Sequence, residues 1–154
     1  VDPSVVERAS TNLFYKSERI TFRDKLRSEK GKWFVQAAAT MANGDVPAGL
    51  EKMKVIANSV DRKSWPVVTY LPFLWRPSEH MFMKPMTATS FAERVGHRLA
   101  HEYSSEITAE VYWSLLELTE ETRLAISKIN PSDNIDVQSF IFVVAKYTDS
   151  DVAS

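Results

Sequence analysis

The sequence predicts an α+β domain that is mostly helical, with about six or seven helices and one short β-hairpin near residues 67–84. Apolar residues recur at intervals of three and four along most of the chain, which is the periodicity of helices packed on a core. The segment between residues 65 and 85 differs, because aromatic and β-branched residues there are interspersed with four prolines. A length of 154 residues suits one domain, which we place at residues 1–147 ahead of a flexible tail at residues 148–154.

The amino-terminal half is expected to be helical throughout. Asp2 and Pro3 supply a helix start, with a side-chain cap and a proline that costs nothing in the first turn. Asn43 and Gly44 supply a stop between the third and fourth helices. The four helices are predicted at residues 3–9, 15–28, 33–41 and 47–60.

The middle of the chain is predicted to be extended. Residues 67–75 and 80–84 are rich in aromatic and β-branched side chains, and residues 76–79 form the turn between them. Pro72 would confine its strand to an edge or a bulge. Exposed aromatic residues beside cations could bind a ligand, and the rim of such a pocket would include His80 and Lys84. The alternative interpretation, which alternation of apolar residues favours, is core packing.

Three helices are predicted in the carboxy-terminal half. Ser90 and Gly96 bound a short helix over residues 91–95. Thr108 caps a long helix that extends to Ile129. Residues 135–147 contain β-branched residues that favour a strand, but the preceding residues 133–136 resemble a helix cap, so we predict a helix.

Composition excludes several classes of site. The chain has no cysteine, which excludes disulfides and thiolate metal sites and favours a reducing compartment, so we expect a cytoplasmic protein. No apolar run approaches the ~20 residues of a membrane span, and we expect no membrane contact. The sequence has no glycine-rich phosphate loop, cysteine nucleophile or serine nucleophile elbow. We therefore assign no catalytic residue, no metal and no cofactor.

Basic and acidic residues are distributed unevenly along the chain. Residues 1–77 contain 13 lysines and arginines against 8 aspartates and glutamates, which gives a net charge of +5. Residues 78–154 contain 6 against 12, a net charge of −6, so the whole chain carries −1. Such asymmetry is typical of a surface that faces a polyanion, or of two halves that attract each other.

A basic segment in the amino-terminal half is the first candidate for a binding surface. If residues 15–28 are helical, spacings of three and four align the cations along one ridge that could follow phosphates or an acidic protein. With Arg76 added from the hairpin, the predicted contact residues are Lys16, Arg19, Arg23, Arg27, Lys30 and Arg76. The alternative is a solvated helix face whose cations pair with carboxylates of the second half.

Two histidines, His97 and His101, are four residues apart and lie near Glu102. On one helix the two rings would share a face and could hold a metal with a third ligand. Gly96 is expected to end the preceding helix, however, and no third ligand is indicated. We therefore interpret both residues as surface or capping histidines.

Two stretches resemble an uncharacterised group of bacterial proteins. The first includes residues 65–85 with its tryptophans and prolines, and the second covers residues 133–141. In that group a longer amino-terminal part precedes a similar region, and the resemblance covers about two thirds of this chain. It implies a bacterial origin and a native start before Val1, and it implies no substrate, cofactor or catalytic residue.

These observations favour a non-catalytic binding module that contacts nucleic acid or an acidic partner through its basic amino-terminal helix. One alternative is a small enzyme with a histidine-containing pocket near the hairpin. Another is a helical oligomerisation or interaction domain, which could pair with a second copy or with other domains of a longer chain.

Overall fold

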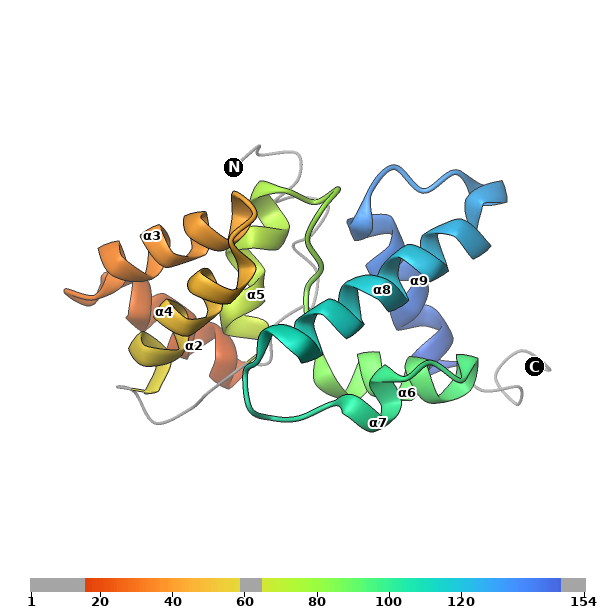
Figure 1. The fold of residues 1–154 in the computed structure, drawn as a ribbon, viewed down its shortest axis with the longest axis horizontal. Coiled ribbons are helices and arrows are strands. Elements are labelled where there is room, and N and C mark those ends of the chain that lie inside the picture. Colours follow the sequence, from red (N-terminus) through yellow and green to blue (C-terminus); the bar gives the residue numbers. More distant parts are fainter. Residues whose placement is uncertain (1–15, 59–64, 148–154) are drawn as a thin grey trace.

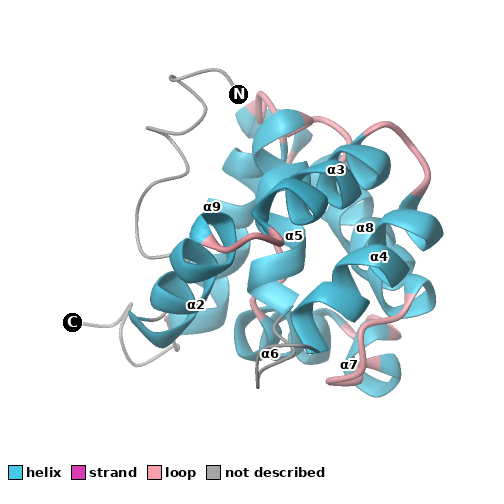
Figure 2. Ribbon diagram, turned by 90° about the vertical axis from the view of Figure 1, so that its left-hand side faces the viewer, coloured by secondary structure: helices cyan, strands magenta, loops and turns pink. Residues whose placement is uncertain are grey.

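The computed structural model describes residues 16–58 and 65–147, and all regular structure in these ranges is helical. Figures 1 and 2 show helices joined by loops, and no strand occurs in the described ranges. The elements are α2 (Lys16–Arg27), α3 (Gly31–Ala42), α4 (Val46–Asn58), α5 (Trp65–Trp75), α6 (Pro85–Val95), α7 (Leu99–Glu102), α8 (Ala109–Ala125), the 3₁₀ turn η1 (Ser127–Ile129) and α9 (Asn134–Lys146).

The helices gather at two ends of the molecule (Figure 1). At one end α3 and α4 form a helical hairpin, and both α2 and α5 pack against α3. At the other end α6 packs on α9 and α7, while α8 contacts α7 and α9. Helix α8 also reaches α4, so its amino-terminal part joins the two ends.

The predicted β-hairpin is wrong, and with it the α+β class. Residues 65–75 form α5, a helix that is buried on most of its surface. Its Pro66 occupies the first turn, where the missing N–H costs nothing, and only Pro72 lies inside the helix. A short apolar run bounded by prolines is equally typical of a buried helix and of a buried strand, so the pattern alone does not distinguish the two.

Residues 80–84 are extended, but side chains from three helices replace the strand partner. The backbone N–H of Met83 donates to Thr69 Oγ1 of α5 at 2.9 Å. The N–H of Met81 donates to the Tyr112 hydroxyl of α8 at 3.1 Å. From α9, Asn134 Nδ2 donates to the His80 carbonyl at 2.9 Å. Buried backbone groups are thereby satisfied without a sheet.

Most other predicted helices are confirmed, with changes at their ends. Thr108 caps α8 by accepting from Val111 N–H at 3.4 Å, and Asp133 caps α9 by accepting from Ile135 N–H at 2.9 Å. Gly96 ends α6 with a φ of 70°, which glycine adopts without strain. Helix α6 begins at Pro85 rather than near Ser90, α8 ends at Ala125, and α7 was not predicted. The predicted helix over residues 3–9 and the tail at 148–154 lie outside the described residues.

Candidate functional site

The predicted basic ridge is only partly available to a partner. Arg23 forms an ion pair with its neighbour Asp24 at 3.0 Å. Lys25 belongs to the same basic segment but is not one of the predicted contact residues; it is buried, and its Nζ donates to the carbonyl oxygen of Ile56 at 2.6 Å near the end of α4. Burial lowers the pKa of Lys25, and the positive charge of Lys30 lowers it further. The Lys16 side chain lies outside the described part.

Besides the ion-paired Arg23, four described cations of this region are exposed to solvent. Within the described ranges they form no ion pair and no hydrogen bond through their side chains. We call them the cation set: Arg19 and Arg27 of α2, Lys30 of the turn and Lys32 of α3. Arg76 does not join them, because it lines a cavity with Asn43 at the opposite end of α3 and lies 3.8 Å from Glu79.

The arginines of the carboxy-terminal half contrast with the cation set. Arg98 pairs with Glu102 and Glu117, and its Nε lies 2.6 Å from Glu117 Oε2. Arg123 pairs with Glu120. Arg94 donates to the carbonyls of Val144 and Tyr147 at the end of α9. These arginines have partners within the chain, whereas the cation set leaves its charge available.

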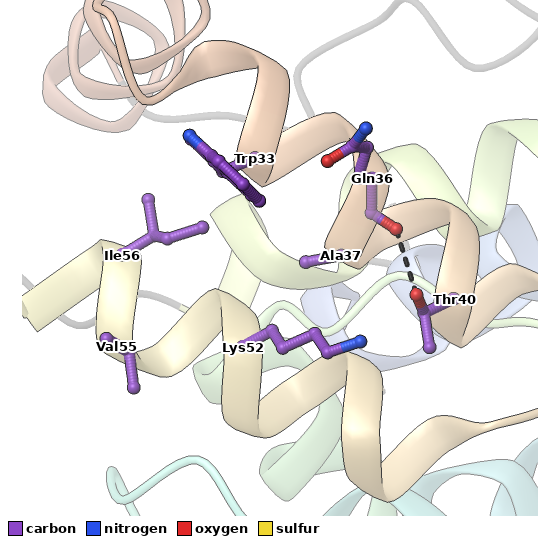
Figure 3. A pocket seen from close by; sticks show the side chains of 7 residues that line it. All are labelled: Trp33, Gln36, Ala37, Thr40, Lys52, Val55 and Ile56. Carbon is purple, nitrogen blue, oxygen red and sulfur yellow. Dashed lines mark hydrogen bonds between the residues drawn. The ribbon is translucent and has the colours of Figure 1, made fainter.

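An apolar groove lies between α3 and α4, and Lys30 and Lys32 of the cation set shortly precede its residue Trp33 in the chain. It has a volume of about 410 Å³ and is shown in Figure 3. Trp33 is 65 % exposed on one wall, and Val55 is 68 % exposed on the other. The Lys52 side chain lies along the groove (Figure 3), and it forms no ion pair with any described residue. The groove residues are Trp33, Gln36, Ala37, Thr40, Lys52, Val55 and Ile56.

Sequence reasoning missed this groove. The prediction for residues 33–41 is a helix without any binding residue, and Trp33 is part of it. The signal was present in the spacing, because Trp33, Gln36 and Thr40 share the helix face opposite Phe34 and Met41. Polar residues next to an exposed tryptophan indicate a solvent-facing stripe.

The predicted pocket rim near residues 76–84 has a different environment in the structure. His80 is buried, and its Nδ1 lies 3.1 Å from the hydroxyl of the buried Tyr112. Lys84 is also buried, with its Nζ 5.7 Å from the ring centre of Phe142. None of these residues lines the α3–α4 groove. Their contacts are those of a packed core.

Burial lowers the pKa of His80, and this predicts a loss of stability in acid. The nearby Arg76 acts in the same direction, while a hydrogen bond to the Ala42 backbone and the charge of Glu79 oppose it. An unfolded histidine binds a proton below about pH 6.5, whereas folded His80 does so only at lower pH. The unfolded state therefore holds more protons as pH falls from about 6.5 toward the lowered pKa.

We expect the free energy of unfolding to decrease over that range by up to about 1.4 kcal/mol per pH unit from this residue. Urea unfolding at several pH values should show a shallower acid loss for His80→Gln than for the unmodified chain. His101→Gln, at an exposed histidine, should follow the unmodified chain. Equal pH dependence in all three proteins would contradict the assignment.

His97 lies beside two carboxylates that sequence reasoning had not linked to it. Its buried Nε2 is 4.0 Å from Glu117 and 4.0 Å from Glu121, and these three side chains could together hold a metal. The exposed His101 does not belong to this group. The useful signal was the spacing of four between the two glutamates on α8.

Two contacts oppose a metal at this position. His97 Nδ1 accepts from the backbone N–H of Leu99 at 3.1 Å, so the proton of a neutral ring must be on Nε2. A metal-bound histidine normally does the reverse, because the nitrogen remote from the metal donates its N–H to an acceptor. Arg98 also donates a hydrogen bond to Glu117, so a positive charge already lies beside this carboxylate. A hydrogen bond from Arg98 lowers the pKa of Glu102 as well. We therefore do not assign a metal site here.

Comparison of the chain with protein-family models, curated proteins and solved structures found no match. The resemblance to a bacterial group therefore stays a prediction. None of the described helices combines the length and apolar character needed to cross a membrane.

Proposed function

We propose that this chain is a non-catalytic binding module that contacts an acidic segment of a partner protein through the cation set. The observation that carries the proposal is the contrast between cations. Arg94, Arg98 and Arg123 are held by groups of the same chain. The four residues of the cation set have no such partner within the described ranges. Unpaired surface charge of one sign steers and orients a partner of the opposite sign.

An apolar surface next to the cations favours a protein over a nucleic acid. Binding to a duplex depends on a series of phosphate contacts. Within the predicted ridge Arg23 is paired with Asp24, and the nearby Lys25 turns inward to the Ile56 carbonyl. The α3–α4 groove supplies apolar contact area next to Lys30 and Lys32, which a phosphate backbone would not use. An acidic protein segment that also has apolar side chains fits both features.

A direct-binding measurement tests the proposal. The probes are a labelled peptide of about 20 residues, made of glutamate and leucine in irregular order, and duplex and single-stranded DNA of similar length. Fluorescence anisotropy at about 0.15 M ionic strength should show binding of the peptide and weaker binding of both DNAs. Replacing all four residues of the cation set by glutamine should weaken peptide binding about tenfold or more.

The matched control is Arg123→Gln with Lys128→Gln, which removes two cations of the acidic half. This variant should bind the peptide as the unmodified chain does. Absence of peptide binding at low ionic strength would overturn the proposal. If either DNA binds more tightly than the peptide, the partner is a nucleic acid and not an acidic protein.

A further inference from the structure

The α3–α4 groove has the features of a site for one amphipathic helix. Its walls are the exposed Trp33 of α3 and the exposed Val55 of α4, with Ala37 and Ile56 between them (Figure 3). An exposed tryptophan beside an apolar groove is the kind of anchor that contributes strongly to binding.

The backbone hydrogen bonding around the groove favours a helical ligand over an extended peptide. An extended peptide gains affinity by adding a strand to a sheet edge, and the described ranges contain no sheet. The backbone groups of α3 and α4 along the groove are engaged within their own helices. The groove therefore offers side-chain contacts only, and a third helix can use these because its own backbone is already hydrogen-bonded.

The charges at the groove favour an acidic occupant. Lys52 is the charged residue among those that line it, and it forms no ion pair with the rest of the described chain. Lys30 precedes Trp33 by three residues, which places it one turn away, and Lys32 is the adjacent residue. Glu29 is the one acidic side chain in this turn, so cations remain in excess.

From these observations we infer that the α3–α4 groove binds the apolar face of an acidic amphipathic helix, with Trp33 and Val55 against apolar side chains and Lys52 paired to a carboxylate. The inference rests on the proposed function and specifies the partner. A helix that presents leucines at i, i+3, i+4 and i+7 would lay them into the groove. Its glutamates would then face Lys52 and the cation set.

Two peptides of equal composition test this inference. One has leucines at helical spacing and glutamates elsewhere, and the other is the irregular-order peptide. Fluorescence anisotropy should show that the amphipathic peptide binds the full chain about tenfold more tightly. Circular dichroism should show that it gains helical signal on binding.

Variants of the groove separate it from the rest of the surface. Trp33→Ala should weaken binding of the amphipathic peptide about tenfold or more and weaken binding of the irregular peptide much less. Val55→Ser offers a second exposed position if the tryptophan variant folds poorly. Lys52→Glu should weaken binding of the amphipathic peptide, and this effect should be largest at low ionic strength. Trp113→Ala, at a half-exposed tryptophan on α8, is the matched control and should have no effect.

The possible outcomes distinguish the two proposals. Equal affinity for both peptides would overturn the groove while leaving the acidic-partner proposal in place. Equal weakening by Trp33→Ala and Trp113→Ala would also overturn it. If neither peptide binds, the proposed function itself is wrong. If sedimentation shows a dimer and Trp33→Ala dissociates it, the occupant of the groove is a second copy of the chain and not a partner helix.

Discussion

Replacing Tyr112 by phenylalanine should lower the free energy of unfolding by about 2–4 kcal/mol. The Tyr112 hydroxyl accepts from the backbone N–H of Met81 at 3.1 Å. Its own proton can go to His80 Nδ1 at 3.1 Å or to the Met81 carbonyl at 3.3 Å. All these groups are buried, so the variant leaves a donor and at least one acceptor unsatisfied, and each costs about 1–3 kcal/mol.

The phenyl ring keeps the packing, which isolates the role of the hydroxyl. The rings of Trp65 and His80 lie nearly parallel to that of Tyr112, with centroids at 6.5 and 6.1 Å. Urea unfolding followed by far-UV circular dichroism measures the loss. Tyr147→Phe, at an exposed tyrosine, is the matched control and should change stability by less than about 0.5 kcal/mol. A similarly small change in Tyr112→Phe would refute the expectation.

Gly49→Ala should destabilise the chain by about 3 kcal/mol, although alanine is the better helix former. A Cβ at Gly49 would lie 2.5 Å from Met41 Cβ, 2.6 Å from its backbone nitrogen and 2.7 Å from its Cα. Backbone atoms cannot turn aside as a flexible side chain can. The α3–α4 hairpin must therefore separate to admit one methyl group, and it loses packing around the buried Met41.

The same unfolding measurement tests Gly49→Ala, with Glu51→Ala as its control. Glu51 is exposed on the same helix, and its 3.9 Å contact with Lys54 contributes little. An unchanged or raised stability in Gly49→Ala would show that helix propensity outweighs the close approach. The groove gives a second readout, because the amphipathic peptide should bind more weakly once the two helices have moved apart.

Helix ends with local chemical signals were the part of the fold that the sequence predicted well. Thr108, Asp133 and Gly96 each act through their own side chain or backbone within a few residues, so the pattern shows them directly. The segment over residues 65–84 was mispredicted because its conformation depends on distant groups. Tyr112 and Asn134, far along the chain, satisfy the backbone that a second strand would otherwise have satisfied.

The candidate binding surface was predictable as a region but not in its detail. The excess of cations before residue 33 indicated the region in which we place the proposed surface. It could not show that Lys25 turns inward to the Ile56 carbonyl, since that contact joins residues 31 positions apart. The groove depends on how α3 and α4 cross, and Gly49 sets that distance through a neighbour on the other helix.

The extended segment over residues 80–84 also bears on how the molecule unfolds. Thr69, Tyr112 and Asn134 attach this short segment to helices drawn from both ends of the chain. Freeing any one of them leaves a backbone group of the buried segment without its hydrogen-bond partner. Neither end can lose its structure independently, and the described helices should melt in one cooperative transition.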